Sequence, residues 1–451
     1  MMSTLRHASV GWHPVKIGFL FLFITNLAFA APKQILPIQQ WTTSEGSRVY
    51  FVPAPEIPMV DIQVAFAAGS ARDPKQQDGL ALFTNQLLTE GTSDLNADQI
   101  ASGFESIGAI LNKSLDRDMA KVHLRTITAQ LTPALGLFTK ILSDSTFPKT
   151  SFDREKNRHL TAIQAQAQNP GTIASNAIYR AIYNEHPYAH EPLGTQKTVT
   201  VLTPEQVKRF FKTYYVAENA VIGIVGAVDR KQAESIANEI SSKLNRGKAA
   251  ATLPTVDVAR VVAGEKKIAH PSTQTHIRMG TVGIAVNDPD YFPLILGNNI
   301  LGGKMIVSRL FKEVREKRGL SYHAASMFMP LAMRGPFIVI LQTETQQAPL
   351  ALKTAQETVD TFIASGPTAK ELAGAKTDIA GGLMLSINSN DAIVDHITKA
   401  GFYNLPLDYL DTYVSNMNNV TAEQMKDAFQ RRISTKMATV LVGKDAKPVA
   451  Q

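Results

Sequence analysis

Arg315 and Tyr322 are the two residues whose types and spacing could perform chemistry together. The segment before Gly319 is predicted to be a helix, because its apolar residues recur at the spacing of one buried face: Ile306, Leu310, Phe311 and Val314. Gly319 is predicted to be the left-handed cap of this helix, and a strand is expected from about Ser321. This reversal would bring a guanidinium beside a phenol. Such a pair is suited to hold a peptide carbonyl as it becomes an oxyanion.

The same residues also have a purely structural interpretation. Arg315, Lys317 and Arg318 would lie in the last turn of the helix, where cations interact well with the negative end of the helix dipole. A tyrosine that opens a strand is commonly half-buried packing. Taken alone, these residues favour the structural interpretation over the catalytic one.

Hydrophobic periodicity predicts two series of strands and helices around this pair. In the first series we expect strands at 49–52, 59–67, 110–115, 120–126 and 220–228, and helices at 79–90, 97–107, 130–143, 151–168, 172–184 and 204–213. In the second we expect strands at 275–286, 322–329, 336–343 and 438–442, and helices at 291–301, 306–317 and over most of 347–432. Strands in hairpin-like succession with clustered helices indicate an α+β fold.

The two series end in the same way. Residues 203–208 and 421–426 share the pattern TxEQxK, and each precedes a predicted strand that ends at a glycine, Gly226 or Gly443. Capped amphipathic helices before strands are common, but the shared pattern favours an internal duplication. We therefore predict an N-terminal domain at 31–245, a linker at 246–262 and a C-terminal domain at 263–451.

The first 30 residues are typical of a secretory signal peptide. Arg6 and Lys16 provide the positive start, residues 17–30 provide a short apolar run, and Ala28-Phe29-Ala30 provides a cleavage site after Ala30. The run is shorter than a membrane span requires, so a retained anchor is the weaker alternative. No later stretch is long and apolar enough to span. The sequence therefore predicts an exported, periplasmic protein with no permanent membrane span.

Composition excludes several classes of function. The 451 residues are 44% apolar and 19% charged, as in an ordinary globular protein. Loss of Arg6 and Lys16 would lower the net charge from +7 to +5, which argues against nucleic acid as a partner. The chain has no cysteine, so disulfides, thiolate metal sites and cysteine nucleophiles are excluded.

The sequence contains none of the other common catalytic motifs. There is no GxxxxGK[ST], no strand-linked GxGxxG, no GxSxG, no HExxH and no HxxEH. His186 and His190 are at helical spacing, but Pro187 between them spoils a two-ligand helical face. His323 is expected to point to the opposite strand face from Tyr322 and to be a surface or packing residue. We predict no metal site and no cofactor in this chain.

The order of elements resembles that of the pitrilysin-type metallopeptidases, the processing-peptidase or inverted-zincin family, over essentially the whole mature chain. Members of that family consist of two homologous α+β domains, each an antiparallel sheet packed by helices, that form half of a clamshell around a peptide. Their catalytic halves carry a helix with the pattern G-x-A-H-x-x-E-H-x-x-x-x-G-T. The segment from Gly79 to Thr92 keeps the glycines, the alanine and the threonine of this pattern.

The resemblance implies that the zinc chemistry has been lost. The two histidine positions hold Leu82 and Gln86, and the position of the general base holds Asn85. The family's third ligand is a glutamate about 76 residues further on, which counts to Ala162. Leucine cannot bind zinc, and a neutral amide is a poor ligand and no base. These four positions are interpreted as a degenerate zinc site.

The segment from Arg315 to Tyr322, in contrast, matches the family's second motif, an arginine and a tyrosine seven apart in the C-terminal half. In the family this pair orients the substrate carbonyl and stabilises the tetrahedral intermediate. The resemblance therefore implies a catalytic role for Arg315 and Tyr322.

The sequence as a whole favours the non-zinc subunit of a two-chain metallopeptidase. A homologous subunit with HxxEH and zinc would be its partner, a peptide its substrate, and Arg315 and Tyr322 would act in trans. Two alternatives remain open: a catalytically inert structural or assembly subunit, and a peptide-binding, chaperone-like homodimer.

Overall fold

The computed structural model describes residue 1, residues 34–304 and residues 306–444. The predicted signal segment beyond Met1, with its cleavage site after Ala30, lies outside these residues. From Leu36 onward the chain forms one compact unit. In the described ranges, no helix combines the length and the apolar character that crossing a membrane would require.

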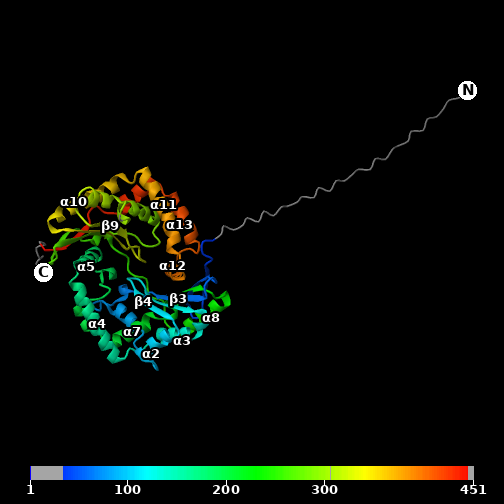
Figure 1. Cartoon of the computed structure of the whole chain (residues 1–451). Coiled ribbons are helices and arrows are strands. Elements are labelled where there is room, and N and C mark those ends of the chain that lie inside the picture. The colour runs from blue at the N-terminus through cyan, green and yellow to red at the C-terminus, as the bar shows by residue number, and fades with distance from the viewer. Residues whose placement is uncertain (2–33, 305, 445–451) are drawn as a thin grey trace. The chain divides into compact units, whose positions relative to one another are not determined.

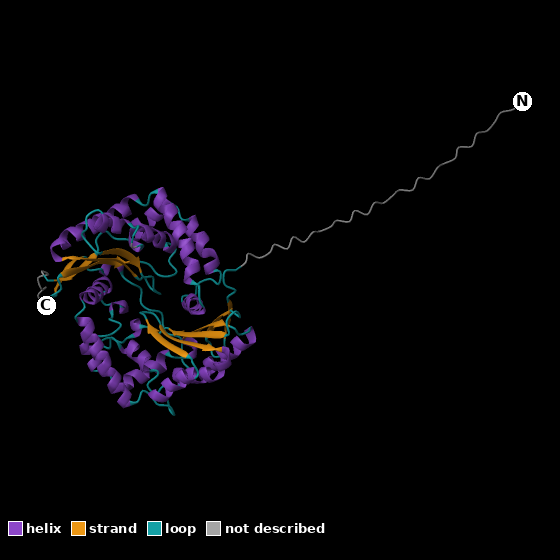
Figure 2. Ribbon diagram, in the orientation of Figure 1, coloured by secondary structure: helices purple, strands orange, loops and turns teal. Residues whose placement is uncertain are grey.

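The first half of the chain builds a six-stranded sheet in the order β1-β2-β6-β3-β5-β4 (Figure 2). Its strands are β1 Gln39–Thr42, β2 Arg48–Pro53, β3 Met59–Phe66, β4 Ile110–Leu115, β5 Ala120–Ile127 and β6 Ala220–Gly226. Neighbours are antiparallel except β2 and β6, which are parallel. The sheet is therefore mixed, and the expected antiparallel character holds for all but this one pair of strands.

The second half builds a five-stranded sheet in the order β7-β11-β8-β10-β9. Its strands are β7 Gly264–Ala269, β8 Gln274–Val282, β9 His323–Phe328, β10 Pro336–Glu344 and β11 Ala438–Gly443. Here β7 and β11 form the parallel pair, and the other neighbours are antiparallel. Apart from β1, this sheet repeats the strand order and the strand directions of the first sheet.

Helices pack against both sheets, most of them on the outer faces (Figures 1 and 2). Those of the first half are α1 Leu80–Leu87, α2 Ala97–Ser106, α3 Leu131–Ser143, α4 Lys149–Ala167, α5 Pro170–Tyr183, α6 Gln196–Thr200, α7 Pro204–Tyr214 and α8 Arg230–Lys243. Those of the second half are α9 Tyr291–Asn298, the π-helices η6 Asn299–Gly303 and η7 Phe311–Glu316, α10 Ala348–Ser365, α11 Ala369–Ser386, α12 Asn390–Phe402, α13 Tyr409–Asn419 and α14 Ala422–Arg432.

The repeated TxEQxK pattern corresponds to a repeated helix start. Thr203 and Gln206 form a capping box at α7, and Thr421 and Gln424 form the same box at α14. In each box the threonine side chain accepts from the backbone N–H three residues on, and the glutamine side chain accepts from the threonine N–H. Together with the repeated sheet order, these boxes support the predicted duplication.

Each half contributes one helix to the sheet of the other half. Helix α5 packs on β8 and β11, and α12 packs on β2, β3 and β6. Figure 1 shows α12 lying over β3. Along α12, Asp395 accepts from Lys121 at 2.7 Å and from Gln63 at 3.3 Å, both on strands of the first sheet. The two halves therefore share cores as well as a connecting segment.

The helix that precedes Arg315 begins later than the sequence predicts. Ile306 was expected on the buried face of a helix, but its side chain is 72% exposed, whereas Leu310 and Val314 are fully buried. The physical reason is a cap at Ser308, whose hydroxyl accepts from Phe311 N and whose carbonyl accepts from Lys312 N. The helical segment therefore begins after Ile306, and its last part, η7, has π rather than α geometry.

Candidate functional site

The structure brings Arg315 and Tyr322 together. Gly319 has φ +61° and is the predicted left-handed cap; its N–H donates to Arg315 O, and Leu320 N donates to Val314 O. The chain then turns into β9, which begins at His323 rather than near Ser321. Across this turn, Arg315 Nη1 donates to the backbone oxygen of Tyr322 at 3.0 Å. The guanidinium is thus fixed beside Tyr322 through the main chain.

Arg315 differs from its basic neighbours in what it contacts. Lys317 Nζ and Arg318 Nη1 both bond the carboxylate of Glu313, at 2.6 Å and 2.7 Å. Within the described part of the chain, no acidic side chain forms an ion pair with Arg315. A guanidinium has five N–H donors, so most of those of Arg315 remain available to another acceptor.

The pair lines an open hollow of about 260 Å³. The other lining residues are Gly319, Leu320, Ser321, Glu344 and Gln347. Tyr322 is 68% exposed, so its hydroxyl can reach a bound molecule. The Arg315 guanidinium, which is permanently charged, and the Tyr322 hydroxyl can therefore both donate to the carbonyl oxygen of a bound molecule. Such donors would stabilise negative charge that develops on that oxygen.

The degenerate zinc segment lies on α1, which two glycines and an aspartate hold in place. Gly79 has φ +96°, and a Cβ there would lie 2.8 Å from Leu193 O. Gly91 has φ +156°, and its Cβ would lie 2.8 Å from the Pro148 ring. The buried carboxylate of Asp73 accepts from the N–H groups of Gly79 and Ala81, which the first turn of a helix leaves without a partner. These contacts explain why the residues flanking the zinc positions persist without zinc chemistry.

The side chains at the zinc positions are engaged in other contacts. Leu82 is half-buried and offers no ligand atom. Asn85 is 1% exposed and points inward, where its Nδ2 donates to the Tyr215 hydroxyl at 3.2 Å. Gln86 is exposed and its side-chain amide bonds a histidine on α4.

That histidine, His159, was missed by sequence reasoning. Its Nδ1 lies 3.0 Å from Gln86 Oε1, and its Nε2 lies 2.6 Å from Leu193 O. Burial lowers the pKa of His159, so the ring is neutral at pH 7. The Leu193 carbonyl can only accept, so Nε2 carries the proton and Nδ1 accepts from the Gln86 amide, whose O and N are interchangeable. Ala162 is exposed, one turn further along α4. A signal existed: Glu155, His159 and Ile163, at intervals of four, form a buried face.

A lysine completes this region. Lys113 on β4 donates to the carbonyl oxygen of Gln86 and to the Thr89 hydroxyl, at the C-terminal end of α1. Burial lowers the pKa of Lys113 to about 8, so the amine is still mainly protonated at pH 7. Leu82 has no atom that could bind zinc, and the side chains of Asn85 and Gln86 are already hydrogen-bonded. The positive charge of Lys113 lies close by, so these residues do not fit a zinc ion.

His186 and His323 give no better metal site. His186 uses both ring nitrogens within the fold, accepting from Tyr188 N and bonding Pro254 O. Half-buried His323 has a lowered pKa because of burial and the nearby Arg278 and Arg315.

Among residues 34–304 and 306–444, one group of three potential ligands has its atoms within 4.8 Å of one another: Asp61, His123 and Asp391. Arg125 Nε already donates to Asp61 at 2.9 Å. A divalent cation would have to lie beside that guanidinium, so we assign no metal there.

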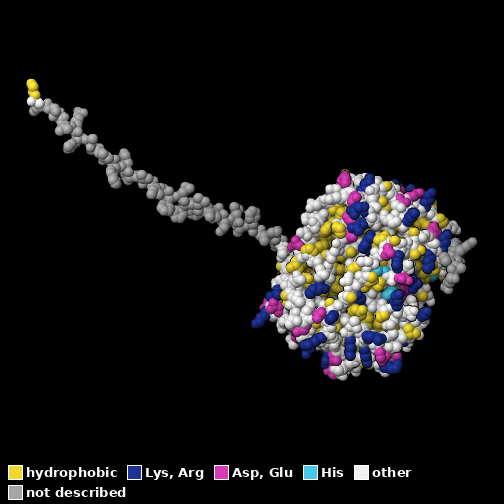
Figure 3. Space-filling model, turned by 180° about the vertical axis from the view of Figure 1, so that it is seen from behind, with side chains coloured by type: hydrophobic (Ala, Val, Ile, Leu, Met, Phe, Trp, Pro, Cys, Tyr) yellow, Lys and Arg dark blue, Asp and Glu magenta, His cyan; other side chains and the backbone are white. Residues whose placement is uncertain are grey.

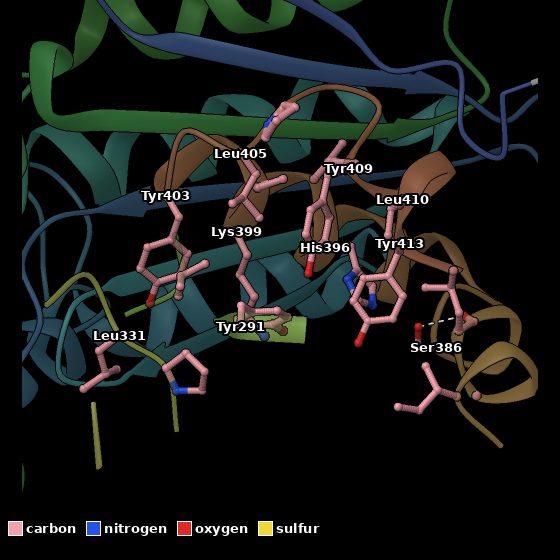
Figure 4. Close-up of a pocket in the computed structure, with 18 of the residues that line it drawn as sticks. Tyr291, Leu331, Ser386, His396, Lys399, Tyr403, Leu405, Tyr409, Leu410 and Tyr413 are labelled. Carbon is pink, nitrogen blue, oxygen red and sulfur yellow. Dashed lines mark hydrogen bonds between the residues drawn. The ribbon is translucent and has the colours of Figure 1, made fainter. Parts of the chain in front are cut away.

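A larger cavity, of about 750 Å³, lies away from both regions (Figure 4). It is enclosed by α9, η6, α11, α12 and α13, with Asp116 and Met119 from the β4–β5 turn. Neither Arg315 and Tyr322 nor the residues of α1 line it. On the face shown in Figure 3, acidic and basic side chains are interspersed.

Comparison with known protein families matches most of the chain in two segments. Residues 48–196 match the family described as insulinase (peptidase family M16). Residues 202–379 match the description "Peptidase M16 inactive domain".

Solved structures and curated relatives agree with these matches. The crystal structure of a peptidase M16 inactive domain from Pseudomonas fluorescens is 40% identical, covers 92% of this chain and 99% of its own, and has a TM-score of 0.87. The structure of a protease from Helicobacter pylori, 18% identical, shares the fold with a TM-score of 0.83 over 90% of this chain and 99% of its own. An uncharacterized zinc protease of Bacillus subtilis is 25% identical over 90% of this chain and 98% of its own length.

Proposed function

Because this chain belongs to the peptidase M16 family, we propose that it is the non-zinc subunit of a two-subunit zinc metallopeptidase. In this proposal a homologous subunit supplies HxxEH and the metal. The present chain contributes part of the peptide-binding surface, together with Arg315 and Tyr322 in trans. The substrates are peptides or unfolded segments of proteins.

The proposal rests on the difference between the degenerate zinc positions and the pair Arg315 and Tyr322. Leu82, Asn85 and Gln86 lack the groups that zinc requires, whereas Arg315 and Tyr322 are exposed and adjacent. An inert scaffold would have no use for an arginine without an acidic partner beside an exposed tyrosine. A subunit that acts on a carbonyl held by another chain would use both.

The role of the pair follows from its geometry. Arg315 is tied to the main chain of Tyr322, so its guanidinium is held beside the residue that carries the second donor before a carbonyl arrives. Such preorganised donors stabilise an oxyanion without having to reorient, which is the main advantage of an enzyme site over water. The attacking water and the general base would come from the partner.

Peptide binding has a second source of support in the sheet edges. Strands β4 and β9 are the outermost strands on one side of each sheet. An edge strand offers unpaired N–H and C=O groups, and an extended peptide can pair with them. We place the complex in the periplasm, on the basis of residues 1–30.

The test is co-expression with the homologue that carries HxxEH. The chain purified alone should contain no stoichiometric zinc and cleave no peptide. The pair should co-elute on size exclusion, contain one zinc per heterodimer and cleave unfolded peptides. One tightly held zinc in the isolated chain, with hydrolysis that a chelator abolishes, would show the proposal to be wrong.

The two alternatives give different results in the same experiment. An inert assembly subunit would co-elute, but the activity of its partner would not depend on Arg315. A chaperone-like homodimer would bind peptides as a dimer of this chain and would not respond to the homologue. Neither alternative accounts for an exposed Arg315 that forms no ion pair with any acidic side chain in the described residues.

A further inference from the structure

The 750 Å³ cavity has the size and composition of a ligand site, and the function proposed above makes no use of it. Four tyrosines line it: Tyr291 from α9, Tyr403 directly after α12, and Tyr409 and Tyr413 from α13. Figure 4 shows their rings gathered with Leu405 and Leu410 around one space. Tyrosine combines a large apolar ring with one polar tip, so it suits ligands that have both characters.

Two tyrosines and the histidine of the lining are neutral. Burial, together with the neighbouring Tyr291, raises the pKa of both Tyr409 and Tyr413, and each bonds the side chain of Tyr291. Burial also lowers the pKa of His396, so the imidazole is neutral at pH 7. These groups can bond backbone N–H and C=O groups of a ligand without requiring charge on it.

The charged groups of the lining already have partners. Lys399 is paired with Asp395 at 2.6 Å, and Lys304 is paired with Asp378. Asp116, also in the lining, accepts from the backbone N–H groups of Asp118 and Met119, and neither lysine of the lining is free to hold a phosphate or a nucleotide. An occupant that is polar along its backbone and apolar in its side chains fits better.

We propose that this cavity binds a large aromatic or aliphatic side chain of the peptide substrate, at a distance from Arg315 and Tyr322. The proposal rests on the function proposed above and defines its substrate class as peptides with exposed bulky apolar residues. Two observations connect the cavity to the peptide path. Asp116 lines the cavity directly after β4, one of the two edge strands. Pro330 and Leu331 line it just after β9, the edge strand that begins next to Tyr322.

Gly382 provides a way to fill the cavity without disturbing the fold. It lies on α11 and lines the cavity, and a Cβ built on it meets nothing within 4 Å. A helix loses nothing when glycine is replaced, because glycine is a poor helix former. The neighbouring Gly381 also has nothing within 4 Å of its Cβ but does not line the cavity. Gly382→Phe is therefore the test variant and Gly381→Phe its matched control.

The measurement is fluorescence anisotropy with the full chain alone, using two labelled peptides that differ only in one central residue, Phe or Ala. Burying a phenylalanine side chain corresponds to about 10–100-fold in Kd, so the Phe peptide should bind more tightly by that factor. Gly382→Phe should remove this preference, and Gly381→Phe should keep it. Gly382→Leu repeats the test with a better helix former, and circular dichroism verifies folding.

Equal binding of both peptides to the wild-type chain, or an unchanged preference in the folded Gly382 variants, would overturn the proposal. So would a result in which the Gly382 variants exclude a fatty acid such as oleate but still prefer the Phe peptide. The assay requires neither zinc nor a partner subunit. The peptidase activity of the reconstituted pair could prove independent of Arg315, which would contradict the proposed function. The preference for the Phe peptide would still be decided by the anisotropy measurement alone.

Discussion

Four neighbouring side chains distinguish a catalytic from a structural reading of the reversal around Gly319. Lys317 and Arg318 are held by Glu313, as expected for cations that support a helix end. Arg315 instead donates to the carbonyl oxygen of Tyr322 and lies over the Phe311 ring, and the Tyr322 side chain is exposed. The two pairs therefore predict opposite results on substitution.

Replacing Tyr322 with phenylalanine in the reconstituted pair should lower kcat by about 10²–10³, because it removes one donor to the oxyanion and keeps the ring. Zinc content and co-elution of the subunits should be unchanged. Lys317→Ala is the control, since its contact with Glu313 is on the surface and contributes about 1 kcal/mol or less to stability. Wild-type activity in Tyr322→Phe would rule out the trans-acting role.

The sequence predicted the positions of these residues better than their contacts. The seven-residue spacing, the cap at Gly319 and the absence of ligand atoms at Leu82 follow from residue type alone. The bond between Gln86 and His159 joins residues 73 apart, and nothing local to either indicates it. Side-chain partners that come from different helices depend on packing, so they cannot be read from spacing.

At the scale of elements, α12 is the clearest example of a helix held by charges of the other half. Lys121, His123 and Arg125 alternate along one face of β5, and Asp391 and Asp395 lie one turn apart on α12 facing them. Burial alone would raise the pKa of Asp395, but Lys121 and Lys399 outweigh burial and lower it to about 2.

This lowered pKa predicts how stability depends on pH. The pKa of an aspartate in the unfolded chain is about 3.9, so the contribution of Asp395 is fully present above pH 4 or so. It is lost as the pH falls from about 4 to about 2. Asp395→Asn should therefore destabilise the chain by about 1–2 kcal/mol at pH 7, a modest value because the side chain is one third exposed. The difference from wild type should shrink toward pH 2.

Urea unfolding at several pH values measures this effect. Asp427→Asn is the control, because Asp427 is exposed and pairs only with Arg431 on its own helix. It should change stability by about 0.5 kcal/mol or less at every pH. A constant difference between Asp395→Asn and wild type down to pH 2 would mean that the Lys121 pair does not fix α12.

Some helix starts were predictable from their cap residues, whereas α6 and α8 were missed although each begins with a capping box. Asn96, a residue type that is favoured at helix starts, forms a capping box with Gln99 at α2, one residue before the predicted helix at 97–107. The π-geometry of η7 was not predictable, because the apolar spacing of Leu310, Phe311 and Val314 is compatible with either helix type. The exchange of α5 and α12 between the halves also leaves no local pattern in the sequence.

At the scale of the whole molecule, duplication was visible through one capping box, but the joining of the halves was not. Asp118, on the turn between β4 and β5, is 4% exposed and accepts three hydrogen bonds. One comes from Tyr188 Oη in its own half, at 2.7 Å. The others come from the second half, from Tyr403 Oη at 3.0 Å and Ala332 N at 2.7 Å. A single carboxylate thus joins both halves.

Asp118→Ala should therefore destabilise the full chain by about 3–5 kcal/mol, because three buried donors lose their shared acceptor. The loss should also weaken the contact between the halves, beyond its effect on either fold. Trypsin can cut the segment between α8 and β7, where Arg246 and Lys248 are exposed. After this cut, the wild-type halves should remain associated on size exclusion in mild urea, and those of Asp118→Ala should separate.

Tyr403→Phe provides the comparison. It removes one donor and leaves Asp118 with two, so the expected cost is about 1 kcal/mol and the cut halves should stay together. If Asp118→Ala and Tyr403→Phe behave alike, the carboxylate is not what joins the halves, and the packing of α5 and α12 on the opposite sheets must be sufficient. If only Asp118→Ala separates them, the union of the two halves depends on a residue that takes two of its three hydrogen bonds from the other half. This is the expected position for a contact that arose after the duplication, since it serves the pair of domains rather than either one.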